Sequence, residues 1–146
     1  MRRIRWMVPA LVVLALLAGC AAGYKTVPAE EAQAFAEKVE PITVQLLTAL
    51  SNHDEAGYLR DMDETMRSVS SGEKFEQVYQ AIIGKIGRYQ SHQFDRVLDK
   101  DRYRIVIYTA QFEKDANVVV RVVFDMTTDP PKVTGLWFDS PVLRRK

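Results

Sequence analysis

The stretch YRIVIYTAQFEKDANVVVRVVFD, Tyr103 to Asp125, decides the fold class of this 146-residue chain. Its two apolar runs have the period of a β-strand, and the turn formers KDAN at 114–117 separate them. In the second run one face is apolar and consists of Val118, Val120, Val122 and Phe124. Arg121 shares the other face with Asp125. We therefore expect an antiparallel hairpin with one buried face and one face at least partly in water.

The strand period extends to both sides of this hairpin. We expect four strands, at about residues 89–98, 102–113, 118–127 and 132–139. Turn formers also fill the other two connections, DKD at 99–101 and DPP at 129–131. Because short connections make neighbouring strands antiparallel, the pattern predicts a four-stranded meander.

Upstream of residue 87 the period changes to that of α-helices. From Pro28, which suits a first helical position, one face is formed by Phe35, Val39, Ile42, Leu46 and Leu50. Pro41 lies inside this pattern, and its missing N–H predicts a kink or a break near residues 37–40. A shorter helix is expected from about Asp54, with Ala56, Leu59, Met62 and Met66 as its buried side.

A third helix is expected between residues 70 and 87. Ser70 and Glu73 have the spacing of a capping box, and the apolar face that follows comprises Phe75, Val78, Tyr79, Ile82, Ile83 and Ile86. Gly87 suits a left-handed helix end. Helices followed by an antiparallel meander predict an α+β fold of two layers, with the helices packed on the apolar face of the sheet.

The first twenty residues have the order of a secretory signal. Arg2, Arg3 and Arg5 precede an apolar run that contains Pro9 and ends in small residues before Cys20, the sole cysteine. The run is shorter than the roughly 20 residues of a spanning helix. The sequence 17–20, LAGC, resembles a bacterial lipobox, which implies cleavage before Cys20 and lipidation of its sulfur and new amino terminus. Two or three acyl chains would make this anchor durable.

These signals divide the chain into a signal peptide (1–19), a lipidated tether (20–27), a single α+β domain (28–142) and a basic tail (143–146). The tail could meet acidic headgroups but has few charges. We expect a lipid-anchored protein of the bacterial envelope. Ala21 follows the cysteine, where aspartate would resemble an inner-membrane retention signal, so an outer membrane facing the periplasm is favoured if the host has one. The chain after Cys20 has 17 basic and 19 acidic side chains. This balance shows no excess of positive charge of the kind that indicates binding to nucleic acid or anionic lipid.

The order of elements resembles the nuclear transport factor 2-like, or cystatin-like, fold. Within it the chain resembles the bacterial domain-of-unknown-function family 3887, which occurs as lipoproteins and ahead of serine hydrolases. The residues that carry this resemblance are GRYQS at 87–91, YRIVIYTAQFE at 103–113, VVVRVVFD at 118–125 and KVTGLWF at 132–138. The family implies no established chemistry. Similar cone-shaped folds include isomerases and dehydratases that use an aspartate base or a His-Asp pair.

The residues themselves give no catalytic, metal or cofactor motif. His53 and His92 are far apart, no serine has the flanks of a hydrolase nucleophile, and Gly84 and Gly87 lack the spacing of a phosphate loop. Acid-base chemistry needs a carboxylate in a cavity, for which the candidates are Asp54, Asp61, Asp125 and Asp139. Such residues usually cap helices or line wet sheet faces, and Asp125 alternates with the apolar face.

Aromatic residues are the best material for a binding pocket, although at these spacings they more often form the core. The candidate ligand-binding residues are Tyr58, Tyr79, Tyr108, Phe124 and Trp137, with Phe112 and Phe138 in the same aromatic set. Our leading hypothesis is a lipoprotein with a non-catalytic domain that binds a small apolar ligand or an envelope protein, in the helix-sheet cavity or on the exposed sheet face. Two alternatives are a small isomerase or dehydratase with an aspartate base, and a dimeric structural module.

Overall fold

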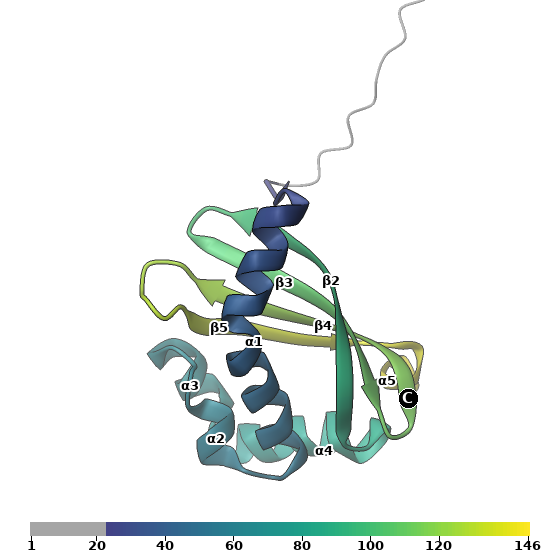
Figure 1. The fold of residues 1–146 in the computed structure, drawn as a ribbon. Helices are drawn as coiled ribbons and strands as arrows, with labels where there is room; N and C mark the ends of the chain where they lie inside the picture. The colour runs from purple at the N-terminus through teal and green to yellow at the C-terminus, as the bar shows by residue number, and fades with distance from the viewer. Residues whose placement is uncertain (1–22) are drawn as a thin grey trace, which may run out of the picture.

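The computed structural model describes residues 23–146, which form an antiparallel sheet covered on one face by helices. The helices are α1 (Ala29–Ser51), α2 (Glu55–Leu59), α3 (Glu64–Ser70), α4 (Glu73–Ile86) and α5 (Pro141–Arg144). The strands are β1 (Lys25–Thr26), β2 (Tyr89–Lys100), β3 (Tyr103–Phe112), β4 (Asp115–Asp125) and β5 (Lys132–Asp139). Figure 1 shows α1 lying across the sheet, with α2, α3 and α4 at one end of it. The expected α+β class and the meander are confirmed.

The sheet has five strands in the order β1-β2-β3-β4-β5, so the expected number of four was wrong. The additional strand β1 lies where the sequence predicted a tether. Lys25 pairs with Asp99 and Thr26 with Leu98, and the Val27 N–H continues the contact by donating to the Val97 carbonyl at 3.0 Å. A strand of two residues has no readable period, so pairing with β2 decides its structure.

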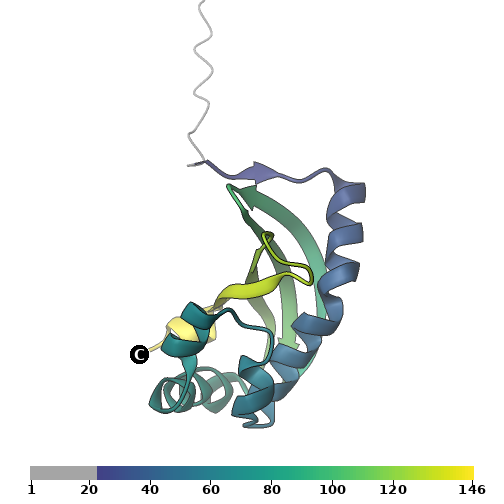
Figure 2. The ribbon, with the colours of Figure 1, turned by 90° about the vertical axis from the view of Figure 1, so that its left-hand side faces the viewer.

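Helix α1 continues through Pro41, so the expected break does not occur. The helix bends along its length over the sheet, as Figure 2 shows. Its buried face includes Phe35, Val39, Leu46 and Leu50, which cover the concealed side of the strands. One lost backbone hydrogen bond is a small cost beside the burial of this face.

The segment between α1 and α4 forms two short helices, where the sequence predicted one. Asp54 caps α2 by accepting from the Gly57 N–H at 3.0 Å, and Asp63 caps α3 by accepting from the Met66 N–H at 2.7 Å. The linker between them pairs with the sheet edge, because the Asp63 N–H donates to the Val133 carbonyl at 2.9 Å. Two aspartate caps, each with its own helix start, explain the division.

The expected capping box at Ser70 and Glu73 was wrong. Ser70 is the buried last residue of α3, and Gly72 stands at the N-cap of α4, where its N–H donates to the Glu55 carboxylate at 2.6 Å. Gly87 does end α4 with a positive φ of 79°, but its ψ of −167° is not that of a left-handed helical residue. A Cβ at Gly87 would also lie 2.7 Å from the Glu113 carboxylate, which accepts from the Arg88 N–H.

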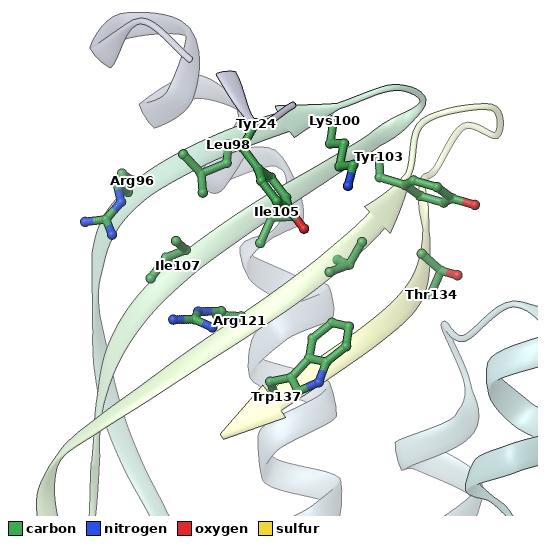
Figure 3. A pocket seen from close by; sticks show the side chains of 11 residues that line it. Tyr24, Arg96, Leu98, Lys100, Tyr103, Ile105, Ile107, Arg121, Thr134 and Trp137 are labelled. Carbon is green, nitrogen blue, oxygen red and sulfur yellow. The ribbon is translucent and has the colours of Figure 1, made fainter. Parts of the chain in front are cut away.

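The core lies between the helices and the covered face of the sheet. Its largest fully buried side chains include Tyr58, Phe75, Tyr108, Phe124, Leu46 and Leu50. Helix α5 closes one end, because Lys85 of α4 donates to the carbonyl oxygens of Leu143 and Arg145. The basic tail predicted at 143–146 therefore begins within a helix that packs on the domain. Over the part of the chain that the structure describes, no helix lies on the opposite face of the sheet (Figure 3).

Candidate functional site

A hollow of about 580 Å³ lies on the face of the sheet that the helices leave open. Figure 3 looks onto it, with α1 behind the sheet. The residues that line it come from four strands, β2 to β5, and the segment before β1: Tyr24, Arg96, Leu98, Lys100, Tyr103, Ile105, Ile107, Arg121, Val123, Thr134 and Trp137. Its volume falls within the range of small-molecule sites.

The apolar floor of the hollow follows from β3, which is apolar on both faces. Ile105 and Ile107 point to the open side, while Val106 and Tyr108, which alternate with them, are fully buried on the covered side. Ile107 is only 5% exposed although no helix of the described residues covers it. A strand with one wet face would normally carry polar residues at these positions.

A β-bulge in β2 brings cationic side chains to the open face. Phe94 pairs with Tyr108, but the next paired residue is Arg96, opposite Ile107. The extra residue reverses the alternation, so Arg96, Leu98 and Lys100 line the hollow and Val97 is buried. A bulge therefore decides which side of the sheet these residues occupy.

Aromatic side chains flank the hollow at two ends. Tyr24 extends over the floor beside Lys100, whose Nζ lies 4.8 Å from the Tyr24 ring centroid. Trp137, on β5, is paired with Arg121 and is 57% exposed. Its indole covers the backbone of Gly135, where a Cβ would lie 2.6 Å from the ring. Glycine at 135 thus permits the close approach of the ring to the strand.

The cations of the hollow differ in their partners. Arg96 forms an ion pair with Asp95 at 2.8 Å. Among the described residues, Lys100 and Arg121 have no carboxylate within ion-pair distance, although Arg121 contributes to lowering the pKa of Asp139. A cation on an apolar floor, without an ion-pair partner, suits an anionic or amphiphilic ligand.

The structure does not bring the five predicted ligand-binding residues into one pocket. Tyr58, Tyr108 and Phe124 are buried between helices and sheet, and Tyr79 packs at the margin of the same core, 4.3 Å from the His53 ring between centroids. Trp137 lies on the opposite face. Alternation along β4 is sufficient to predict that Phe124 lies on the covered face. The position of Trp137, in contrast, depends on a register shift between β4 and β5.

The buried tyrosines have the chemistry of core residues. Burial raises the pKa of Tyr58 to about 12, and burial raises that of Tyr108 to about 12 against the opposing effect of a hydrogen bond with Thr43. The hydroxyl oxygens of Tyr108 and Thr43 are 3.2 Å apart. Both phenols therefore remain protonated at neutral pH and act as neutral hydrogen-bonding groups.

The four candidate acids serve the fold at separate places. Asp54 caps α2, and Asp61 pairs with Arg60 at 2.7 Å. Asp125 has a pKa below the ordinary range, chiefly because it accepts hydrogen bonds from the Thr127 N–H and hydroxyl.

Asp139 also has a lowered pKa, chiefly because of the hydrogen bonds donated by Arg144. A lowered pKa keeps a carboxylate ionised and makes it a weaker base at neutral pH, which is the reverse of what acid-base catalysis needs.

The two histidines lie in different surroundings. His53 pairs with Glu76 at 2.7 Å in the turn after α1. His92 is nearly buried and joins β2 to α1, with Nδ1 2.7 Å from the Tyr89 hydroxyl and Nε2 3.0 Å from the Glu40 carboxylate. Within residues 23–146, no three His, Cys, Asp or Glu side chains are placed to hold a metal ion.

The predicted lipidation site Cys20 and the predicted signal peptide lie outside the described residues. Over the part of the chain that the structure covers, no helix is long and apolar enough to cross a membrane.

The comparison with protein families gives one match. The model of the family described as a protein of unknown function, DUF3887, matches residues 44–129. The chain belongs to the DUF3887 family. No curated protein matches it, and no solved structure does.

The DUF3887 segment begins within α1 and ends in the turn after β4. It includes the floor and the cations of the hollow, while Tyr24, Thr134 and Trp137 lie outside it. The sequence carries one sign of the hollow, because Ile105 and Val123 are apolar at positions that alternate with the buried face.

Proposed function

We propose that this DUF3887 protein is a lipid-anchored protein of the bacterial envelope whose domain is a non-catalytic binding module. Its binding site is the hollow on the open sheet face, and its ligand is apolar or amphiphilic. The fold we assign is the nuclear transport factor 2-like, or cystatin-like, arrangement, supported by the order of the helices and the meander that follows them.

The single observation that carries this proposal is the distribution of apolar groups over the two sheet faces. Large side chains fill the space between the helices and the sheet, which was one of the two places where the sequence predicted a binding site. On the other side Ile105, Val123 and Trp137 form an apolar surface that no helix or strand of residues 23–146 covers. Contiguous exposed apolar surface in a folded domain marks an interaction site.

The non-catalytic part of the proposal rests on the surroundings of the carboxylates. An isomerase or dehydratase of this architecture would need an acid in a closed cavity, with a tyrosine or histidine within hydrogen-bond reach. Asp54, Asp61, Asp125 and Asp139 each hold a helix cap, a turn or an ion pair instead.

Native mass spectrometry of the lipidated protein, released gently from its own membranes, tests the binding module. A bound mass that is lost in Trp137→Ala and kept in Tyr79→Phe would support the open-face site. A ligand retained equally by both variants would move the site elsewhere, and an unliganded monomer would remove the small-ligand proposal in favour of an envelope protein partner.

The anchor has its own test, which is membrane fractionation of Cys20→Ser. We expect the variant to lose lipid and to leave the membrane fraction, and unchanged fractionation would refute the anchor.

A second candidate function, a dimeric structural module, is favoured by the exposure of Trp137 on an open apolar sheet face. Pairing of two copies through this face would bury the same hollow. Light scattering distinguishes the two, because the dimer requires twice the mass of the chain and its loss in Trp137→Asp.

A further inference from the structure

Charge is distributed unevenly over the described domain. After Cys20 the chain has 17 basic and 19 acidic side chains, a small acidic excess. Among the described residues that line the open-face hollow, however, three are cationic and none is acidic: Arg96, Lys100 and Arg121. Tertiary folding has therefore collected positive charge on a face of an otherwise acidic domain.

The carboxylates that adjoin the hollow on the same face are already neutralised. Asp125 pairs with Arg102 at 3.0 Å, and Asp139 pairs with Arg144 at 2.5 Å. The charge that remains available is that of Lys100 and Arg121. An anionic surface would meet these cations without displacing an ion pair at either one.

The remaining side chains of this face have the composition of a membrane interface. Tyr24, Tyr103 and Trp137 surround an apolar floor that includes Ile105. Tyrosine and tryptophan are enriched at the headgroup level of bilayers because one end of each ring is apolar and the other polar. Basic and aromatic groups around apolar surface are the pattern of interfacial binding to anionic lipid.

The length of chain before the hollow places this face near a membrane. Tyr24 lines the hollow and follows Cys20 by four residues. At about 3.3–3.6 Å per extended residue, those four residues reach at most about 14 Å. If Cys20 carries lipid, as the proposed function holds, the Tyr24 end of the hollow cannot lie far from the leaflet.

We propose that the open sheet face docks on the leaflet that holds the anchor, and that its ligand is anionic phospholipid. Lys100 and Arg121 face the phosphate groups, and Tyr24 and Trp137 lie at the level of the headgroups. This inference rests on the proposed function, whose binding site it keeps, and it names the ligand class as a lipid with an anionic head.

Tryptophan fluorescence tests the docking directly, because the chain has two tryptophans, Trp6 and Trp137. The lipidated protein, which cleavage before Cys20 would leave with Trp137 as its single tryptophan, would be reconstituted in vesicles whose acyl chains carry bromine, a contact quencher. Vesicles of phosphatidylcholine alone would be compared with vesicles that also contain phosphatidylglycerol. We expect strong quenching of Trp137 only with phosphatidylglycerol, and its relief by high salt.

The matched variants change the same charge on the two sides of the domain. Lys100→Glu with Arg121→Glu should lower the docked-to-undocked ratio in phosphatidylglycerol vesicles by at least about 10-fold, because each cation contributes to attraction by an anionic surface. Lys38→Glu with Lys74→Glu, on the exposed sides of α1 and α4, should leave quenching unchanged. The milder pair Lys100→Gln and Arg121→Gln serves if the first variant fails to fold by circular dichroism.

Three results would overturn the proposal. The first is equal quenching of Trp137 in both kinds of vesicle. The second is no quenching in either kind of vesicle while aqueous iodide still quenches Trp137. The third is shielding of Trp137 from both quenchers, which would show a second copy or another protein on this face. Failure of the anchor looks different, because an unlipidated chain does not float with vesicles of phosphatidylcholine alone, whereas an anchored but undocked chain floats with Trp137 unquenched.

Discussion

The two faces of the sheet use the same strands for different purposes. On β4, Val120 and Phe124 are fully buried under the helices, while Arg121 and Val123, their neighbours in sequence, lie on the open face. The covered face stabilises the folded state, because its side chains leave water completely. The open face has apolar and cationic groups beyond what folding requires. Substitutions at covered positions of one strand should therefore lower stability, and substitutions at the alternating open positions should affect binding instead.

The largest difference is expected for a charge placed on either face of β4. Val120→Asp would bury an unpaired carboxylate at a site that is 0% exposed, and we expect it to unfold the domain, at a cost above about 4 kcal/mol. Arg121→Asp, one residue away, should change stability by less than about 1 kcal/mol. Circular dichroism during heating measures both, and similar loss in the two variants would contradict the assignment of the faces.

Truncation of an aromatic ring on each face should give the next largest effect. Phe124 packs edge to face on Phe35, with ring centroids 5.8 Å apart, so Phe124→Ala should cost about 3–5 kcal/mol. Trp137→Ala removes a ring that is 57% exposed and should cost less than about 1.5 kcal/mol. Urea unfolding gives both values. A larger loss for Trp137→Ala would mean that the open face is part of the folding core.

Removal of a single hydroxyl sharpens the same comparison. Tyr108→Phe leaves the buried Thr43 hydroxyl without its partner and should cost about 1–2 kcal/mol in urea unfolding. Tyr103→Phe on the open face of the same strand should be nearly neutral, since Tyr103 is only partly buried. An equal cost would show that the Tyr108–Thr43 contact does not stabilise the fold.

Acid should act on the domain through Asp125, whose pKa lies below its ordinary value. A carboxylate whose pKa is lower in the folded state stabilises the fold above its unfolded pKa of about 3.9. That stability is lost as the pH falls through the lower, folded pKa. Asp125→Asn should therefore flatten the fall of melting temperature below about pH 4.

Thr127→Val should reduce the same slope, because the Thr127 hydroxyl donates to Asp125 at 2.8 Å. An unchanged slope in both variants would assign acid sensitivity to other carboxylates.

The smallest expected effect is that of Gly135→Ala. The new methyl would meet the Trp137 ring at 2.6 Å, so the indole must move away from the strand. We expect a red shift in tryptophan emission from further exposure, measured in the Trp6→Phe chain, with a stability change within about 0.5 kcal/mol. An unchanged emission maximum would show that the ring does not rest on Gly135. Gly84→Ala, on the surface of α4, is the control.

The sequence alone predicted the α+β class and the meander, because these follow from local periods and turn residues. It predicted the family through the resemblance of segments such as 103–113 and 118–125. Alternation in Val118, Val120, Val122 and Phe124 was sufficient to place the buried face of β4. The same local reasoning failed for α2 and α3, where caps at Asp54 and Asp63 compete with a weak apolar period. It also failed for β1, which is formed by pairing with a distant strand.

The open-face hollow depended on contacts that local sequence does not encode. Reading along the chain identified Trp137 as an aromatic candidate and Cys20 as the expected anchor, and it gave the net charge. The bulge beside Phe94, the register shift beside Val123 and the pairing of β1 brought Tyr24, Lys100, Arg121 and Trp137 to one face. Period-2 alternation fixes a face only within an uninterrupted strand, and one extra residue reverses it. Strand pairing, which joins segments far apart in the chain, therefore decided which side chains meet.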